Sequence, residues 1–106
     1  MRRLSITVLS VLQAIADEHQ YGFDIIDVTG LPSGTVYPIL RRLDREGLLG
    51  SKWEKHATAQ QEQRPPRRYY ALTAAGERMR RGAAARFPAL DQAIAGELRR
   101  LKPSRA

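Results

Sequence analysis

The stretch that decides the fold runs from Gly30 to Glu54 and reads GLPSGTVYPILRRLDREGLLGSKWE. At about 100° per residue, Val36, Leu40 and Leu43 fall on one apolar stripe of a helix. The opposite face carries two residues of short profile followed by two arginines, namely Gly34, Pro38, Arg41 and Arg45. Such a helix can bury one side and bring the other close to a partner. An ordinary surface helix with solvated arginines is the alternative.

The segments before this helix predict a helix-turn-helix. Apolar residues in 5–16 repeat at helical spacing, and a second, shorter repeat begins at Tyr21. Gly30 suits the left-handed residue that ends many helices, and Pro32 suits the opening turn of the next one. A short helix, a glycine turn and a second helix follow one another in this motif. We expect His19, in the polar run between the first two helices, to be solvated.

A hairpin that we call the wing follows the arginine-bearing helix. Gly47 suits the end of that helix, residues 48–54 read as a strand, and residues 68–72 read as its partner. The polar segment 55–66 closes with two prolines and predicts a flexible hairpin tip. Five basic residues of the wing can straddle a phosphate backbone or reach a minor groove: Lys52, Lys55, Arg64, Arg67 and Arg68. A solvated loop with dispersed charge is the alternative.

Composition favours a polyanionic partner over catalysis. The 106 residues carry a formal net charge of +7, and the basic excess is concentrated after residue 40. There is no cysteine, and the two histidines lie far apart in the sequence, so we expect no metal, no cofactor and no enzymatic activity. Nucleic acid is the first candidate partner, and a protein-interaction module that docks an acidic protein is the alternative.

The N-terminus imitates a short secretory signal, because Arg2 and Arg3 precede an apolar segment. Polar residues interrupt that segment at helical spacing, which indicates an amphipathic helix instead. No stretch approaches the roughly 20 apolar residues of a membrane span. We therefore expect a cytoplasmic protein with no membrane partner.

The C-terminal part predicts one long helix, from an N-cap at Thr73 to about Lys102. Its apolar residues recur at steps of four and three, a seam that so small a domain can hardly bury alone: Met79, Ala83, Phe87, Leu90, Ile94, Leu98 and Leu101. We expect a second copy of the chain to cover this seam; packing on the chain's own first helix is the alternative. Pro88 can bend this helix or split it in two.

The elements together predict a mainly α chain with a small two-stranded β wing. Residues 1–72 form a winged helix-turn-helix DNA-binding domain in this prediction, and residues 73–106 form a helical dimerisation segment.

Several short motifs occur in a characteristic order and spacing: Tyr21-Gly22-Phe23, Gly34-Thr35-Val36-Tyr37-Pro38, Leu40-Arg41-Arg42-Leu43, Glu46-Gly47-Leu48, Trp53-Glu54, Pro66-Arg67-Arg68-Tyr69-Tyr70, and Leu72-Thr73 with Gly76. This series resembles the PadR-like transcriptional regulators over roughly residues 4–76. The resemblance implies a dimeric winged-helix protein, usually a repressor, whose long C-terminal helix pairs two subunits so that both recognition helices meet successive major grooves. We expect a pseudo-palindromic operator on double-stranded DNA and release by a small-molecule effector that the sequence does not identify.

The resemblance places Thr35, Tyr37, Pro38 and Arg41 at DNA-facing positions. Tyr21-Gly22 is expected to serve packing, and Tyr70 is expected to pack under the wing. Pattern and resemblance together give the expected DNA-binding set: Ser33, Gly34, Thr35, Tyr37, Pro38, Arg41, Arg42, Arg45, Lys52, Lys55, Arg64, Arg67 and Arg68.

Overall fold

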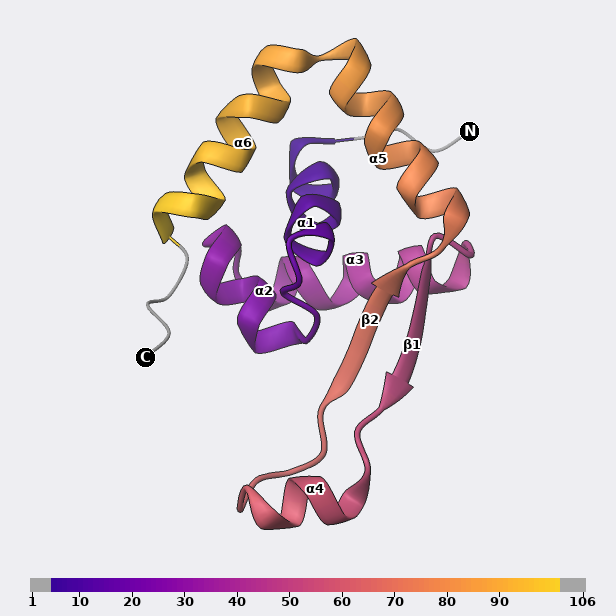
Figure 1. The fold of residues 1–106 in the computed structure, drawn as a ribbon, viewed down its shortest axis with the longest axis vertical. Helices are drawn as coiled ribbons and strands as arrows, with labels where there is room; N and C mark the ends of the chain where they lie inside the picture. The colour runs from indigo at the N-terminus through magenta and orange to yellow at the C-terminus, as the bar shows by residue number, and fades with distance from the viewer. Residues whose placement is uncertain (1–4, 102–106) are drawn as a thin grey trace.

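The structure, a computed structural model, describes residues 5–101, with the side chains of residue 95 and residues 97–101 left out. This part of the chain is mainly helical, with one two-stranded antiparallel sheet, as predicted (Figure 1). The elements in chain order are α1 (Ile6–Ala16), α2 (Gly22–Thr29), α3 (Ser33–Arg45), β1 (Leu49–Trp53), α4 (His56–Gln61), β2 (Arg68–Leu72), α5 (Ala74–Arg86) and α6 (Pro88–Leu101).

The predicted helix-turn-helix is present in α2 and α3. Gly30 has the left-handed backbone that ends α2, with φ 71°, and its N–H donates to the Ile26 carbonyl. Pro32 lies at the N-cap of α3, one residue before the helix begins. Its carbonyl oxygen accepts hydrogen bonds from the backbone N–H groups of Thr35 and Val36. The turn therefore orients α3 without a side-chain cap.

The apolar stripe of α3 lies in the core. Val36 and Leu40 are fully buried, and Leu43 is 1% exposed. They belong to one cluster with buried residues of α1, including Val11 and Leu12. The predicted stripe is confirmed, and its burial turns the opposite face of α3 outward.

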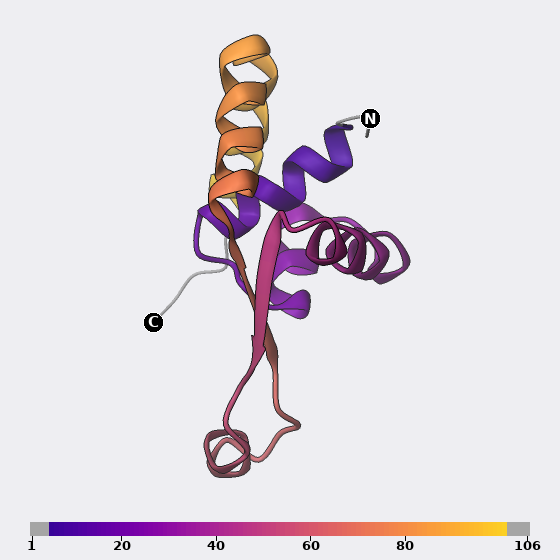
Figure 2. The same ribbon diagram turned by 90° about the vertical axis from the view of Figure 1, so that its right-hand side faces the viewer.

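The wing projects away from the helices (Figures 1 and 2). Its strands pair in a register that sets Leu49 opposite Leu72 and Trp53 opposite Arg68. The prediction of a flexible tip is wrong, because residues 56–61 form the short helix α4. Its Ala59 is buried, with 1% exposure. The tip sequence is rich in alanine and glutamine, which favour a helix wherever the flanking chain holds the ends together.

The single long C-terminal helix is not confirmed, because the chain divides into α5 and α6 at Phe87. Phe87 has non-helical angles, φ −134° and ψ 64°. A residue before proline avoids the α region, and Pro88 has no N–H for the helical ladder. The two helices form an arch above α1 (Figure 1). Of the two outcomes left open for Pro88, the structure shows the split.

The arch packs on its own chain. α6 contacts α1 and α2, and the buried Ala83 and Ile94 belong to the same core cluster as α1–α3. Gln13 of α1 joins both halves of the arch: its side chain donates to Asp91 and accepts from Arg80. Part of the predicted seam is thus covered within the chain, on α1 and α2. Two seam residues, Leu98 and Leu101, lie outside the described side chains.

His19 is buried rather than solvated, with 1% exposure. Glu18 has φ 69°, a left-handed conformation that turns the following residue inward. The His19 N–H then donates to the Ala14 carbonyl, and its Nδ1 lies 2.8 Å from Oδ2 of the buried Asp24. This pair ties the α1–α2 connection to α2.

Candidate nucleic-acid interface

The outer face of α3 is fully accessible. Gly34, Pro38, Arg41 and Arg45 are all exposed, and so is Ser33 at the start of the helix. Apart from the two neighbouring residues and the backbone of α3 itself, no atom lies within 4 Å of where a Cβ on Gly34 would stand, so packing against other parts of the protein does not require glycine there. Among the residues that the structure describes, neither arginine forms an ion pair with a carboxylate. A partner can therefore come close to this face at Gly34 and Pro38, and the positive charges of Arg41 and Arg45 follow along the same face.

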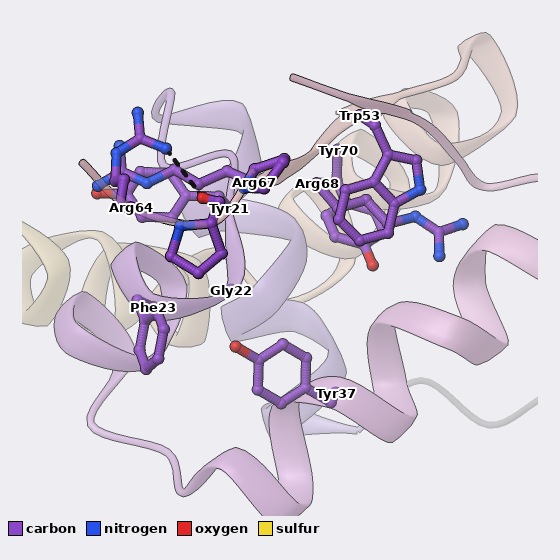
Figure 3. Close-up of a pocket in the computed structure, with 11 residues that line it drawn as sticks. Tyr21, Gly22, Phe23, Tyr37, Trp53, Arg64, Arg67, Arg68 and Tyr70 are labelled. Carbon is purple, nitrogen blue, oxygen red and sulfur yellow. Dashed lines mark hydrogen bonds between the residues drawn. The ribbon is translucent and has the colours of Figure 1, made fainter. Parts of the chain in front are cut away.

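Two other predicted residues of α3 have protein partners. Tyr37 is half-buried and lies against the start of α2 (Figure 3). A Cβ on Gly22 would stand 2.5 Å from its ring, so glycine is required for this contact. Arg42 forms an ion pair with Glu46, at 3.7 Å from Nε to Oε2. Thr35, beside the outer face, is half-buried.

Arg68 connects the wing to α3. Its Nη2 donates to Asp44 Oδ2 at 3.0 Å and to the Ser51 hydroxyl at 3.0 Å. Ser51 in turn donates to Asp44, at 2.9 Å. Since side chains alternate along a strand, Lys52 is on the opposite face of the sheet from Ser51, away from α3. The structure therefore separates Lys52 from the face that Arg41 and Arg45 occupy.

A second ion pair holds the ends of the wing tip together. Arg64 donates to both carboxylate oxygens of Glu54, at 2.5 and 2.9 Å. The hydrogen bonds from Arg64 lower the pKa of Glu54 to about 2, and the backbone N–H of Arg67 adds to this effect. Lys55 is exposed beside this pair. This pair closes the segment that was expected to be a flexible tip.

A cavity of about 320 Å³ lies between the start of α2, α3 and the wing (Figure 3). Its aromatic lining comes from separate parts of the chain: Tyr21, Phe23, Tyr37, Trp53 and Tyr70. Tyr70 is 6% exposed, as expected for a residue packed under the wing, and burial raises its pKa above the usual value. The sequence did not reveal this cavity, because no two neighbouring motifs supply more than part of its wall.

The described residues include no candidate cluster of metal ligands and no candidate membrane-spanning helix. Within residues 5–101, no three histidine, aspartate or glutamate side chains gather as a metal site would require. No helix described here has the length and apolar character needed to cross a bilayer.

Residues 11–81 match the family described as the transcriptional regulator PadR-like family. The chain belongs to this family. The matched range contains α2, α3 and the whole wing, and it confirms the resemblance found in the motifs. No curated protein is significantly similar to the chain.

Solved PadR structures share the fold. A PadR-like transcription factor from Bacteroides fragilis is 29% identical, with a TM-score of 0.66 over 84% of this chain and 86% of that one. A PadR family regulator from Eggerthella lenta is 26% identical, with a TM-score of 0.59 over 83% and 80%. A PadR family regulator from Clostridium difficile, 22% identical with a TM-score of 0.64 over 88% and 97%, agrees in fold. The protein is a PadR-family transcriptional regulator with a winged-helix DNA-binding fold.

Proposed function

We propose that this PadR-family protein binds a specific pseudo-palindromic operator as a homodimer in the cytoplasm and represses transcription until a small molecule releases it. The observation that carries the proposal is the outer face of α3. Its front is exposed and slender at Gly34 and Pro38, while the exposed Arg41 and Arg45 lack carboxylate partners in the described structure. A helix of this kind suits the major groove of B-DNA, which is about 12 Å wide.

The predicted DNA-binding residues divide by their partners. We assign base recognition to the front of α3 and phosphate contacts to cations that no carboxylate neutralises. The first group is Ser33, Gly34, Thr35 and Pro38, and the second is Arg41, Arg45, Lys55 and Arg67. A third group supports the interface through contacts within the protein and comprises Tyr37, Arg42, Arg64 and Arg68. Lys52 contributes only a general attraction, since it is on the far face of the sheet.

We further propose that residues 1–72 contact DNA and that residues 73–106 hold the dimer. Phe87 supports this division, because its large apolar ring is 48% exposed at the top of the arch. Met79 and Leu90 are half-buried beside the core. In this arrangement Ala83 and Ile94 attach the arch to its own subunit. The two α3 helices of the proposed dimer would then meet half-sites about one DNA turn, roughly 34 Å, apart.

The test is a binding titration with the DNA immediately upstream of the chain's own gene, with random duplex as the competitor, over a salt series. We expect preference for the upstream DNA and affinity that falls steeply with salt. Sedimentation of the complex should give two chains for each operator. No retardation of either duplex at low salt would overturn the proposal and favour the protein-interaction alternative.

A further inference from the structure

The end of the wing is a helix rather than a slender turn. α4 lies across the end of the hairpin (Figures 1 and 2). The helix has a regular C-terminal end, because Gln63 adopts a left-handed conformation, with φ 55°, and the Arg64 N–H donates to the Ala59 carbonyl. The two hydrogen bonds from the Arg64 side chain to Glu54 then attach the residue after this end to the end of β1. The tip therefore has a defined and bulky shape.

This tip is too wide for the minor groove of B-DNA. An α-helix with its side chains measures about 10–12 Å across, whereas the minor groove is only about 6 Å wide. Within α4 only Ala59 is buried, so side chains project from most of the surface of the helix. A groove that admitted α4 would have to open, and opening a groove costs deformation energy.

The charge of the tip is balanced. Residues 54–64 contain two acidic and two basic side chains, so their net charge is zero with His56 neutral. Arg64 is neutralised by Glu54. Proteins that enter a minor groove commonly insert arginine, lysine or large apolar side chains, and α4 itself carries none of these. The cations without a carboxylate partner in the described structure are Lys55, just before α4, and Arg67, after the tip.

We infer that the wing lies on the phosphates that border the minor groove, and that α4 keeps the hairpin out of the groove, so that minor-groove base edges contribute nothing to operator choice. This inference rests on the proposed function, and it decides between the two roles that the sequence left open for the wing. Lys55 and Arg67 supply phosphate contacts on either side of α4. The wing thus strengthens binding to every sequence equally and leaves the choice of bases to α3.

Base analogues test which groove is read. Inosine in place of guanine removes the amino group that guanine presents in the minor groove, and 2,6-diaminopurine in place of adenine adds one there; both keep the major-groove pattern. Fluorescence anisotropy measures affinity for the upstream operator with these analogues at the base pairs that border each α3 half-site. We expect the dissociation constant to change by less than about twofold. A loss of about fivefold or more at these pairs would overturn the inference.

Uracil in place of thymine provides the matched major-groove analogue, because it removes only the methyl group that thymine presents there. At the bordering pairs this change should have no effect, since α4 reads no bases. Inside the half-sites it should weaken binding wherever α3 contacts a thymine. A loss of affinity at the bordering pairs would place α4 in a neighbouring major groove and would also overturn the inference.

Salt dependence tests the phosphate contact. Lys55→Gln removes one cation from each subunit of the proposed dimer, so the slope of log affinity against log salt should become smaller by about 1.8. Lys52→Gln removes the same charge from the far face of the sheet and should change the slope by well under one unit. Both lysines are exposed, so the melting temperature should not change. Equal slopes for the two variants would overturn the contact assigned to Lys55.

The outcomes separate the wing from the protein's proposed role. If the protein retards no DNA at low salt, the proposed function fails. If it prefers the upstream DNA but minor-groove analogues weaken binding, the proposed function stands and the inference about the wing alone fails.

Discussion

The sharpest prediction concerns the double variant Arg41→Gln, Arg45→Gln. Both side chains are exposed on α3 and lack carboxylate partners in the described structure, so their replacement breaks no internal ion pair. We therefore expect the melting temperature to stay close to that of the wild type. Affinity for DNA should fall, because two positive charges disappear from the face that we assign to phosphate contact.

The magnitude follows from counting charges. Each cation that neutralises one phosphate of B-DNA contributes about 0.9 to the slope of log affinity against log salt. Two arginines in each of two subunits make four contacts, so the variant should have a slope smaller by about 3.6. Between 50 and 200 mM salt, the wild type should lose roughly a hundredfold more affinity than the variant.

Fluorescence anisotropy with a labelled operator measures this slope directly. The control is Arg78→Gln, Arg81→Gln, which removes the same formal charge from α5, at the end of the fold opposite α4 (Figure 1), together with the Arg81–Glu77 ion pair. Its slope should change by well under one unit. Equal slopes for the wild type and the α3 variant would refute the reasoning, and so would equal effects of the α3 and α5 variants.

Four further results are expected. Gly34→Ala should leave stability equal or raise it by up to about 1 kcal/mol in urea denaturation, since nothing lies within 4 Å of the new Cβ, and yet weaken operator binding. Gly22→Ala should lower the free energy of unfolding by about 1–3 kcal/mol, because the new Cβ would stand 2.5 Å from the Tyr37 ring. Equal stability of the two alanine variants would contradict the contact between Gly22 and Tyr37. The pKa of Glu54 is lowered from 4.5 to about 2, so its ionised form stabilises the wing above pH 4.5, and this stabilisation is lost as pH falls toward 2. Glu54→Gln should therefore reduce the fall in melting temperature between pH 4.5 and 2. A melting temperature that depends on pH in the variant as it does in the wild type would argue against the Arg64–Glu54 pair. Phe87→Asp should dissociate the proposed dimer in sedimentation velocity while leaving the monomer folded, and a retained dimer would exclude the top of the arch from the interface.

The spacing of apolar residues within a segment was sufficient to predict helices that pack one face on the core. Val36, Leu40 and Leu43 were assigned to the buried stripe from spacing alone, and the same spacing placed Arg41 and Arg45 outside. Gly30 ended α2 where a left-handed residue was expected. These predictions succeeded because a helix that buries one face repeats every 3.6 residues, whatever it packs against.

Features that depend on distant partners were missed. His19 is buried because Glu18 turns the chain, and its partner Asp24 belongs to the next helix. The regular wing tip depends on Arg64 and Glu54, ten residues apart. Pro88 marked a break in the seam, but the direction taken by α6 depends on contacts with α1 and α2. Periodicity within one segment holds no information about such contacts.

The wing illustrates why net charge alone misassigns a DNA-binding surface. The sequence offers Lys52, Arg67 and Arg68 as equivalent cations, but each lies in a different setting. Arg68 bridges α3 and β1 through Asp44 and Ser51, so it links the helix that we propose to enter the groove with the hairpin that we propose to flank it. A change there should alter how both elements meet the duplex at once, whereas a change at the far-side Lys52 alters only the general attraction. In the proposed complex, specificity therefore depends on arginines that contact protein as well as on those that we assign to DNA contact.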